Sequence, residues 1–279
     1  MTIKEILSRG MVILKGNNID SPKLKARLLL QYILKKPRQY LIVYDNKEVE
    51  KKQQWEYFVN IDKLTKGVPL QHITHHQEFM KMDFYVDENV LIPRPDTEIL
   101  VEEAIKIAKK MNKPKILDLC TGSGAIAIAM AKNVPEAEVY GIDISAKALE
   151  VAKRNSKELD AKVKFIKSNL FEEIQKKKFD IIVSNPPYIK KNDLKCLSQE
   201  VKNEPELALD GGIDGLDFYR KITSKAIEYL KFGSYLCFEI GFDQKDEVVD
   251  IINSQEHYTN TYFKKDLGGN DRVVVTQVN

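Results

Sequence analysis

Apolar residues recur along this chain with two different periods, and the change from one to the other divides the sequence. Over the first 66 residues they return every three or four positions, as Leu24 and Leu28 do, which predicts a small unit of amphipathic helices. Ser21 followed by Pro22 predicts the beginning of one of these helices, with serine as its N-cap. From Gln71 to Leu91 apolar and polar residues alternate, which predicts a β-hairpin.

From Pro95 onward short apolar runs alternate with stretches of helical period. The expected strands begin at residues 115, 137, 163, 179, 234, 259 and 272, and the expected helices cover residues 96–111, 146–159, 216–230 and 244–252. This alternation predicts an α/β fold with a doubly wound, mostly parallel sheet. We therefore expect a helical domain at 1–66, a β-hairpin linker at 67–94 and an α/β domain at 95–279, and 279 residues is a natural length for two domains.

The strand expected from residue 179 ends in Asn185-Pro186-Pro187-Tyr188. Asn185 offers a side-chain carbonyl, and each proline lacks a backbone N–H and fixes φ, so the turn is stiff and its carbonyls meet no local donor. Tyr188 supplies a flat face. Two acceptors and an aromatic plane suit an amide or an exocyclic amine that is methylated on nitrogen, so we interpret Asn185, Pro186 and Tyr188 as catalytic and the whole tetrapeptide as substrate-binding. The simpler interpretation is an ordinary proline-rich turn.

A second motif lies about 60 residues upstream, where a strand leads into a glycine turn and a helix start, Asp118-Leu119-Cys120-Thr121-Gly122-Ser123-Gly124. Gly122 can take the tight turn, and Gly124 lets the backbone approach a ligand closely. The next strand ends in Asp143, 19 residues after Gly124, which is close to the spacing at which an acid meets a ribose. Ligands of such sheets bind beyond the carboxyl ends of the strands, so Gly122, Asp143, Asn169 and Asn185 should converge in one crevice.

The glycine turn also fits a dinucleotide fingerprint, because Ala127 can take its third position. Three observations favour S-adenosylmethionine instead. The Asp118 carboxylate would oppose a pyrophosphate but could help to hold a cationic amino-acid tail. No lysine or arginine lies between Cys120 and Met130 to meet phosphates. The tetrapeptide at Asn185 also has no use in hydride transfer.

Further segments complete the pattern: Val90-Leu91-Ile92-Pro93-Arg94-Pro95-Asp96-Thr97-Glu98, Glu204-Pro205, Gly211-Gly212-x-Asp214-Gly215-Leu216, Phe238-Glu239-Ile240-Gly241 and Asp271-Arg272-Val273-Val274. With them, nearly the whole chain resembles the HemK/PrmC family of protein N5-glutamine methyltransferases. The resemblance implies a seven-stranded S-adenosylmethionine-dependent methyltransferase sheet and an N-terminal helical domain that recognises the protein substrate. It also implies methyl transfer to the glutamine of the GGQ motif of a peptide chain release factor in the cytoplasm, with S-adenosylhomocysteine as product.

The resemblance further implies a set of cofactor-binding residues: Asp118, Cys120, Thr121, Gly122, Ser123, Gly124, Asp143, Asn169, Leu170 and Asn185. Arg94 is implied to bind substrate, although it serves equally well as a structural hinge between the domains. Two positions depart from the family pattern. Asn169 stands where aspartate is frequent, which keeps an acceptor for the adenine amino group, and Thr74-His75-His76 replaces a segment that usually contains glycine.

The cysteines and histidines of the sequence indicate neither a disulfide framework nor a metal site. Cys120, Cys196 and Cys237 are scattered and odd in number, which indicates reduced thiols in the cytoplasm. His72, His75 and His76 lie in a segment expected to be extended, where zinc would need further ligands, so we expect no metal and assign these histidines no role. The sequence has no apolar run of membrane-spanning length and no cleavable leader pattern.

The charge of the chain bears on whether its substrate is a protein or a nucleic acid. Lysine and arginine total 44 against 41 acidic residues, a net charge of +3, and the best basic run is Lys176-Lys177-Lys178, which a solvated loop explains. We therefore expect no stable binding to nucleic acid, although an amino-methyltransferase acting on adenine or guanine of DNA or RNA would use the same tetrapeptide. A non-catalytic binding module is the third alternative, and it has no need of an intact tetrapeptide. The preferred release factor, the need for a ribosome, the oligomeric state and any general base stay open.

Overall fold

The computed structural model describes residues 1–175 and 177–279, so Lys176 of the lysine run lies outside the described residues. The described chain divides into two compact units. Unit 1 comprises residues 1–75 together with 198–203, and unit 2 comprises residues 76–197 and 204–279. Unit 1 therefore includes a short segment from the C-terminal half of the sequence, and no pattern in the sequence singles this segment out.

Unit 1 is helical, as its apolar period predicts. Its helices are α1 (Ile3–Gly16), α2 (Pro22–Leu34), α3 (Arg38–Val43), α4 (Lys51–Thr65), α5 (Leu70–Thr74) and α9 (Gln199–Lys202). Their apolar faces meet in one core around the fully buried side chains of Ile6, Leu29 and Tyr57. Ser21 is the N-cap of α2 and Pro22 begins the helix, as predicted, although Ser21 has φ of +49° and its side chain makes no capping bond. One prediction of detail is wrong here, because α5 occupies residues expected to begin the hairpin.

The hairpin itself is shorter than the alternation suggested. Its strands are β1 (Gln77–Phe79) and β2 (Met82–Phe84), joined by Met80 and Lys81, which both adopt positive φ. His76 pairs with Asp83 across this hairpin, with 2.8 Å between Nε2 and Oδ1.

Unit 2 contains the predicted seven-stranded, mostly parallel sheet. Its strands are β3 (Lys115–Leu119), β4 (Glu138–Asp143), β5 (Val163–Lys167), β6 (Phe179–Ser184), β7 (Leu230–Glu239), β8 (Tyr258–Lys265) and β9 (Asp271–Val278). They lie in the order β5-β4-β3-β6-β7-β9-β8, and only the pairings of β9 with β7 and β8 are antiparallel. The order reverses between β3 and β6, which is the topological switch point where open α/β sheets bind ligands.

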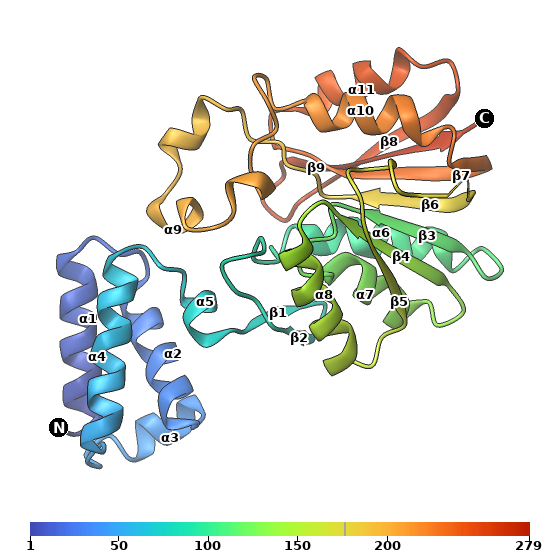
Figure 1. Cartoon of the computed structure of the whole chain (residues 1–279). Helices are drawn as coiled ribbons and strands as arrows, with labels where there is room; N and C mark the ends of the chain where they lie inside the picture. Colours follow the sequence, from blue (N-terminus) through green and yellow to red (C-terminus); the bar gives the residue numbers. More distant parts are fainter. Residues whose placement is uncertain (176) are drawn as a thin grey trace. The chain divides into compact units, whose positions relative to one another are not determined.

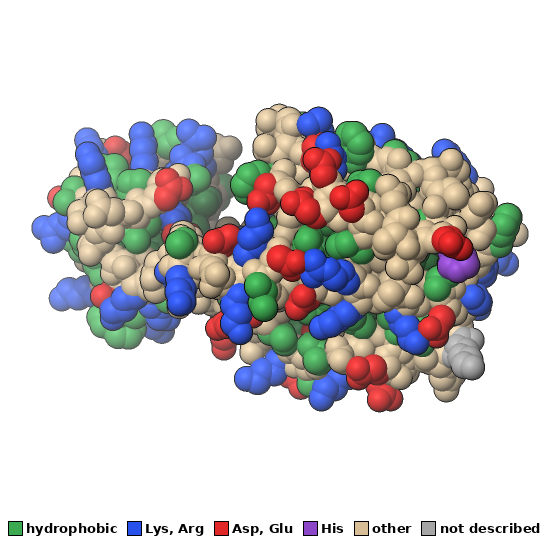
Figure 2. Space-filling model, turned by 90° about the horizontal axis from the view of Figure 1, so that it is seen from above, with side chains coloured by type: hydrophobic (Ala, Val, Ile, Leu, Met, Phe, Trp, Pro, Cys, Tyr) green, Lys and Arg blue, Asp and Glu red, His purple; other side chains and the backbone are tan. Residues whose placement is uncertain are grey.

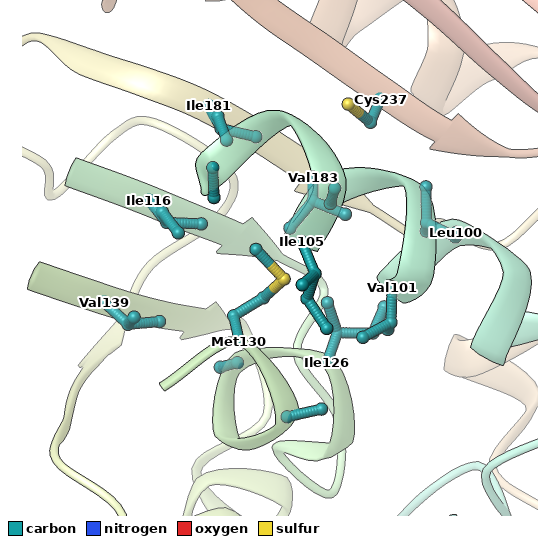
Figure 3. Packing of buried hydrophobic residues seen from close by; sticks show 14 of the residues in the cluster. Leu100, Val101, Ile105, Ile116, Ile126, Met130, Val139, Ile181, Val183 and Cys237 are labelled. Carbon is teal, nitrogen blue, oxygen red and sulfur yellow. The ribbon is translucent and has the colours of Figure 1, made fainter. Parts of the chain in front are cut away.

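Helices cover both faces of this sheet (Figure 1). One face packs against α6 (Thr97–Ala108) and α7 (Ala125–Asn133), with α8 (Ala146–Glu158) beside α7, and the other packs against α10 (Asp217–Ala226) and α11 (Lys245–Asn253). Figure 3 shows the first core, in which Ile105 and Met130 of the helices and Ile116 and Val183 of the strands belong to one cluster. Both cores consist of buried side chains, nearly all aliphatic or aromatic, so the sheet is a rigid support for the loops at its edge.

The predicted helix and strand near residue 230 are shifted. α10 ends at Ala226 rather than at residue 230, and β7 begins at Leu230 rather than at Ser234. Gly233 adopts φ of +77° inside the strand, and the register against β6 slips between Phe179 and Ile181. Phe232-Gly233-Ser234 thus has the composition of a turn but forms an irregularity within a strand. Two short 3-10 helices, Asp193–Cys196 and Glu206–Ala208, complete unit 2. Among the described helices, none has the length and apolarity needed to cross a membrane.

Candidate functional site

A cavity lies at the carboxyl ends of four neighbouring strands of unit 2. Its wall contains Cys120 after β3, Asp143 at the end of β4, Asn169 after β5 and Asn185 after β6. Gly122, Leu170 and Pro187 also line it. Residues from outside these loops complete the wall, namely Asn89, Val90, Leu91, Ser145, Ala148, Pro205, Leu207, Ala208 and Phe218. The structure therefore brings together seven of the site residues predicted from the sequence.

Asp143 holds the glycine turn and the next helix at the same time. Its Oδ2 accepts a hydrogen bond from the Gly122 amide at 2.9 Å, and its Oδ1 accepts one from the Ser145 amide at 2.8 Å. Ser145 caps α8 by accepting from the Ala148 amide at 3.2 Å, as the sequence predicted. Burial raises the pKa of Asp143, and the backbone hydrogen bonds oppose that rise. Each carboxylate oxygen keeps a second lone pair for a ligand hydroxyl.

Asp118 lies beneath the glycine turn and not on the cavity wall. It is fully buried, and its Oδ2 accepts hydrogen bonds from the Thr121 hydroxyl and from the Ala127 amide at the start of α7. Desolvation raises the pKa of this carboxyl group to about 7. Its observed contacts are with the turn that forms the cavity, so any effect on a cationic ligand would act through that turn.

Substitution of Asp118 by asparagine should change how stability depends on pH. The folded pKa of about 7 exceeds the ordinary value of 3.8, so the folded state binds this proton more tightly and loses stability as pH rises from about 4 to about 7. We expect Asp118→Asn to reduce that fall by up to about 1.4 kcal/mol per pH unit. Urea unfolding at pH 5, 6, 7 and 8 measures the slope, and an unchanged slope would contradict the assignment.

Gly124 has a packing role, and the ligand contact expected of it stays a prediction. A Cβ atom there would lie 3.1 Å from the Cβ of Ala152, so this glycine allows the start of α7 to approach α8. Thr121, Ser123 and Gly124 are not among the residues of the cavity wall. Three residues on the wall adopt positive φ: Cys120 at +60°, Gly122 at +53° and Leu170 at +50°. Two of them carry side chains, and backbone strain of this kind concentrates where a ligand is bound.

Gly122 offers a direct test of the ligand position, because a Cβ atom there would meet no protein atom within 4 Å. We expect Gly122→Ala to weaken cofactor binding at least about tenfold, since the added methyl occupies space beside the wall. The strain of an L-residue at positive φ costs about 1–2 kcal/mol of stability. Gly233→Ala is the matched control, because Gly233 has φ of +77° and an equally open surrounding, yet lies away from the cavity. Titration calorimetry measures the affinity of each variant for S-adenosylmethionine. Equal affinities of Gly122→Ala and Gly233→Ala would contradict a ligand position beside Gly122.

Asn169 presents an acceptor to the cavity. Its Nδ2 donates to Glu172 Oε1 at 2.7 Å, which leaves its Oδ1 available. The hydroxyl of Ser168 steadies the same turn by donating to the Leu170 carbonyl and accepting from the Glu173 amide, both at 2.9 Å. An acceptor at this position suits an exocyclic amine such as that of adenine.

The Asn185–Tyr188 loop is held on two sides. Behind it, Asn185 Nδ2 donates to the hydroxyl of Thr97 at 3.2 Å. The Tyr188 hydroxyl lies 3.4 Å from Glu239 Oε1, so the tyrosine contacts buried groups and is not on the cavity wall. Burial raises the pKa of Tyr188 well above its usual value. Pro186 is also absent from the wall, whereas Asn185 and Pro187 contribute to it.

Glycines clamp the backbone of the same loop. A Cβ atom at Gly211 would lie 2.7 Å from Tyr188 Cα, and one at Gly215 would overlap the Tyr188 carbonyl. Gln244, which is buried, donates from Nε2 to that carbonyl at 2.9 Å. The Ile189 amide donates to the Leu209 carbonyl at 3.0 Å, and the Gly211 amide donates to the Ile189 carbonyl at 2.9 Å. The loop is therefore fixed by main-chain contacts that no larger residue would permit.

Arg94 is paired within unit 2. Its guanidinium binds the carboxylate of Glu204, whose side chain is 2% exposed, and Glu204 Oε2 also accepts from the Ile92 amide at 2.9 Å. Arg94 does not lie on the cavity wall. The observed contact thus links the Pro93-Arg94-Pro95 segment to the Glu204-Pro205 segment, and substrate binding by Arg94 stays a prediction.

Thr97, Glu239 and Gln244 contact the Asn185–Tyr188 loop and were not assigned to the site from the sequence. Thr97 and Glu239 do lie in two of the quoted motifs, so their proximity to the loop is the missing information. The wall residues at 89–91 and 205–208 were missed for the same reason. Within residues 1–175 and 177–279, no cluster of three or more His, Cys, Asp or Glu side chains could hold a metal ion.

Comparison with solved structures defines the class of this fold. A methyltransferase from Pyrococcus furiosus matches with a TM-score of 0.54 at 18% identity, over 79% of this chain and 98% of that one. The hMettl16 catalytic domain in complex with the MAT2A 3'UTR hairpin 6 matches with a TM-score of 0.60 at 13% identity, over 75% of this chain and 80% of that one. The fold is that of the methyltransferases.

Sequence comparison specifies the family. Residues 5–74 match the PrmC N-terminal domain, and residues 95–210 match the methyltransferase small domain. The release factor glutamine methyltransferase of Clostridium acetobutylicum is 42% identical over 99% of this chain and 98% of its own length. That of Fusobacterium nucleatum is 41% identical over 98% of this chain and 78% of its own length. The chain belongs to the release factor glutamine methyltransferase family.

Proposed function

We propose that this protein transfers a methyl group from S-adenosylmethionine to the side-chain amide nitrogen of a glutamine in a peptide chain release factor. The observation that carries the proposal is the cavity at the switch point, where Asn185 faces the same space as Gly122, Asp143 and Asn169. Family membership supports the substrate, because relatives matched over their full length are release factor glutamine methyltransferases. S-adenosylhomocysteine is then the second product.

The donor side of the cavity fits the adenosyl group. Asp143 keeps lone pairs for the ribose hydroxyls, Asn169 keeps an acceptor for the adenine amine, and the open space at Gly122 admits a ligand against the backbone. Ala148 and Phe218 provide apolar wall for the adenine ring. When bound, S-adenosylmethionine supplies a methyl group made electrophilic by the adjacent sulfonium.

The acceptor side has to overcome the poor nucleophilicity of an amide, whose nitrogen lone pair is delocalised into the carbonyl. Asn185 Oδ1 and the Pro186 carbonyl each accept one N–H bond of the substrate amide and orient its nitrogen toward the methyl group. As the N–C bond forms and the S–CH3 bond breaks, positive charge develops on the nitrogen, and the two oxygens stabilise it. The nitrogen then loses a proton to solvent. Fixed orientation contributes to the rate as well, since such effects reach roughly 7–11 kcal/mol in favourable cases.

Unit 1 is proposed to bind the release factor. Its helices expose several large apolar side chains, among them Val12, Ile42, Val43 and Trp55. Residues 1–75 also carry 14 lysines and arginines against seven acidic residues, a net charge of +7, whereas the rest of the chain has 30 basic and 34 acidic residues, a net charge of −4. In Figure 2 acidic and basic side chains alternate over the visible face of unit 2, with no concentrated basic area there. An apolar and basic surface suits an acidic protein partner. A release factor acts in translation, so we place this protein in the cytoplasm.

The deciding experiment uses the purified protein, methyl-labelled S-adenosylmethionine and an unmodified release factor from the same cell. We expect label on the release factor, mapped by mass spectrometry to one glutamine and absent from a Gln→Ala variant of the acceptor. Unmodified DNA and RNA serve as parallel acceptors. Label on nucleic acid alone would overturn the proposed substrate while leaving methylation of nitrogen intact, and label on no acceptor, with cofactor binding confirmed, would overturn the proposal.

A further inference from the structure

The orientation of the Asn185 amide decides whether it can serve the reaction. An asparagine side chain ends in one acceptor and one double donor, and only the oxygen can accept a hydrogen bond from a substrate N–H. In the structure Nδ2 donates to Thr97 Oγ1 at 3.2 Å, so Oδ1 is the end that remains for a substrate. Something must keep the amide this way round, because its two ends are nearly equal in shape.

Thr97 is placed to do this. It is the first residue of α6 and 4% exposed, its hydroxyl accepts from Asn185, and hydrogen bonding from Thr97 lowers the pKa of Glu239. A hydroxyl has a single proton to donate. When that proton is given to the Glu239 carboxylate, the oxygen of Thr97 can only accept from Asn185, and the amide must then turn its NH2 group toward Thr97.

Glu239 is held in position by the sheet. It ends β7, one residue beyond Phe238, which pairs with Ser184 of β6, so it lies beside Asn185 in the register. Its side chain is 1% exposed, and the Tyr188 hydroxyl also points at its Oε1 from 3.4 Å. Its Oε2 has no hydrogen-bond partner among the described residues. An ionised carboxylate accepts and never donates, so it fixes the direction of every bond it receives.

We propose that Glu239 and Thr97 are positioning residues that set the polarity of Asn185, so that Asn185 presents its oxygen and not its NH2 group to the substrate amide. The same carboxylate anchors the Tyr188 hydroxyl, and thus both ends of the Asn185–Tyr188 loop are oriented from one buried group. This inference rests on the proposed function, because it concerns the catalytic orientation of Asn185. The motif residues Thr97 and Glu239 therefore orient a catalytic side chain in addition to being buried.

The direction of the hydrogen bonds at Thr97 and Asn185 depends on whether Glu239 is ionised. Burial raises its pKa to about 7, and the bonds from Thr97 and Tyr188 and the charge of Arg272 lower it, whereas the charge of Asp96 raises it. Above this pKa the carboxylate accepts from Thr97 and the polarity is fixed. Below it the carboxyl group carries a proton of its own that it can donate to Thr97, which releases the constraint on Asn185. Turnover should therefore rise with pH through about 7.

The test compares variants of buried threonines in the methylation assay. We expect Thr97→Val to lower kcat about 10- to 100-fold with KM for S-adenosylmethionine changed less than about twofold, and Thr97→Ser to restore most of the loss. Thr223→Val is the matched control, because Thr223 is 1% exposed and its hydroxyl has no hydrogen-bond partner among the described residues. A kcat of Thr97→Val near that of the wild type, or an equal loss in Thr97→Ser, would overturn the proposal.

Two further readouts keep the proposal testable if Thr97→Val folds poorly or if the release factor is not the acceptor. Glu239→Gln should remove the rise of kcat with pH near 7, and a rise that persists unchanged would count against the role of Glu239. The side-chain amide resonances of Asn185, assigned by their loss in Asn185→Ala, should shift in Thr97→Ser or Thr97→Val and stay in place in Thr223→Val. This last readout needs no turnover, so a wild type inactive on the release factor would refute the proposed substrate without deciding the polarity of Asn185.

Discussion

Asn185→Ala should reduce kcat for glutamine methylation by a factor of about 10²–10³ while the protein stays folded. The magnitude is that of removing one preorganised partner from a transition state that develops charge. Asn185 lies on the cavity wall, and its loss leaves Gly122, Asp143 and Asn169 in place, so the affinity for S-adenosylmethionine should change by much less than kcat. Single-turnover transfer of labelled methyl, together with titration calorimetry, measures both quantities.

Asn253→Ala provides the control for Asn185→Ala, because Asn253 is an exposed asparagine at the end of α11 and lies away from the cavity. The control should match the wild type in kcat and in thermal stability. Near-normal turnover of Asn185→Ala on the release factor would contradict the proposed mechanism. A parallel loss of kcat and of cofactor affinity would instead assign Asn185 to holding the donor.

Gly211→Ala should cost almost as much activity, although Gly211 itself is not on the cavity wall. Its Cβ would lie 2.7 Å from Tyr188 Cα and 2.8 Å from the Tyr188 carbonyl carbon, so the loop backbone must move. A displacement of about 1 Å at a catalytic group can lower the rate about 100-fold. Overpacking of this kind also lowers the free energy of unfolding by about 1–3 kcal/mol. Steady-state kinetics and urea unfolding on one preparation distinguish the two effects.

Gly16→Ala is the matched control for Gly211→Ala. Both glycines have ordinary φ values, and a Cβ atom at Gly16 would meet nothing within 4 Å. We expect full activity from Gly16→Ala, with stability unchanged or raised by up to about 1 kcal/mol because the residue ends a helix. A wild-type kcat for Gly211→Ala would mean that the Asn185–Tyr188 loop tolerates movement. The close packing of Gly211 against Tyr188 would then have no effect on catalysis.

Sequence patterns predicted the sheet of unit 2 well because its strands are short apolar runs punctuated by glycine, proline and polar caps. The end of β6 at Ser184, just before Asn185, and the cap of α8 at Ser145 follow from local chemistry alone. Convergence at the cavity also followed, since parallel strands bring their carboxyl ends to one edge of a sheet. Nearest neighbours in the chain determine the strand end and the helix cap, whereas the convergence follows from the parallel order of the strands.

Side-chain partners far apart in the sequence could not be predicted in this way. Nothing local to Thr97 indicates that it contacts Asn185, and nothing local to Glu204 indicates that it receives Arg94 and the Ile92 amide. The packing of Gly124 against Ala152 of α8 was missed for the same reason, because the spacing of this glycine suggested only a ligand contact. Glycine allows close approach in either case, and only the fold decides what approaches.

Residues 198–203 give unit 1 a second attachment along the chain. The chain leaves unit 2 after Leu197 and returns to it at Glu204, and in between Glu200 pairs with Lys25 and Asn203 donates to the Gly67 carbonyl at 3.0 Å. A single protease cut near residue 75 would therefore leave unit 1 tethered through α9. Removal of residues 1–75 would leave α9 without its partners, only two residues from the glutamate that receives Arg94. The two units are consequently not interchangeable modules, because neither is a continuous piece of chain.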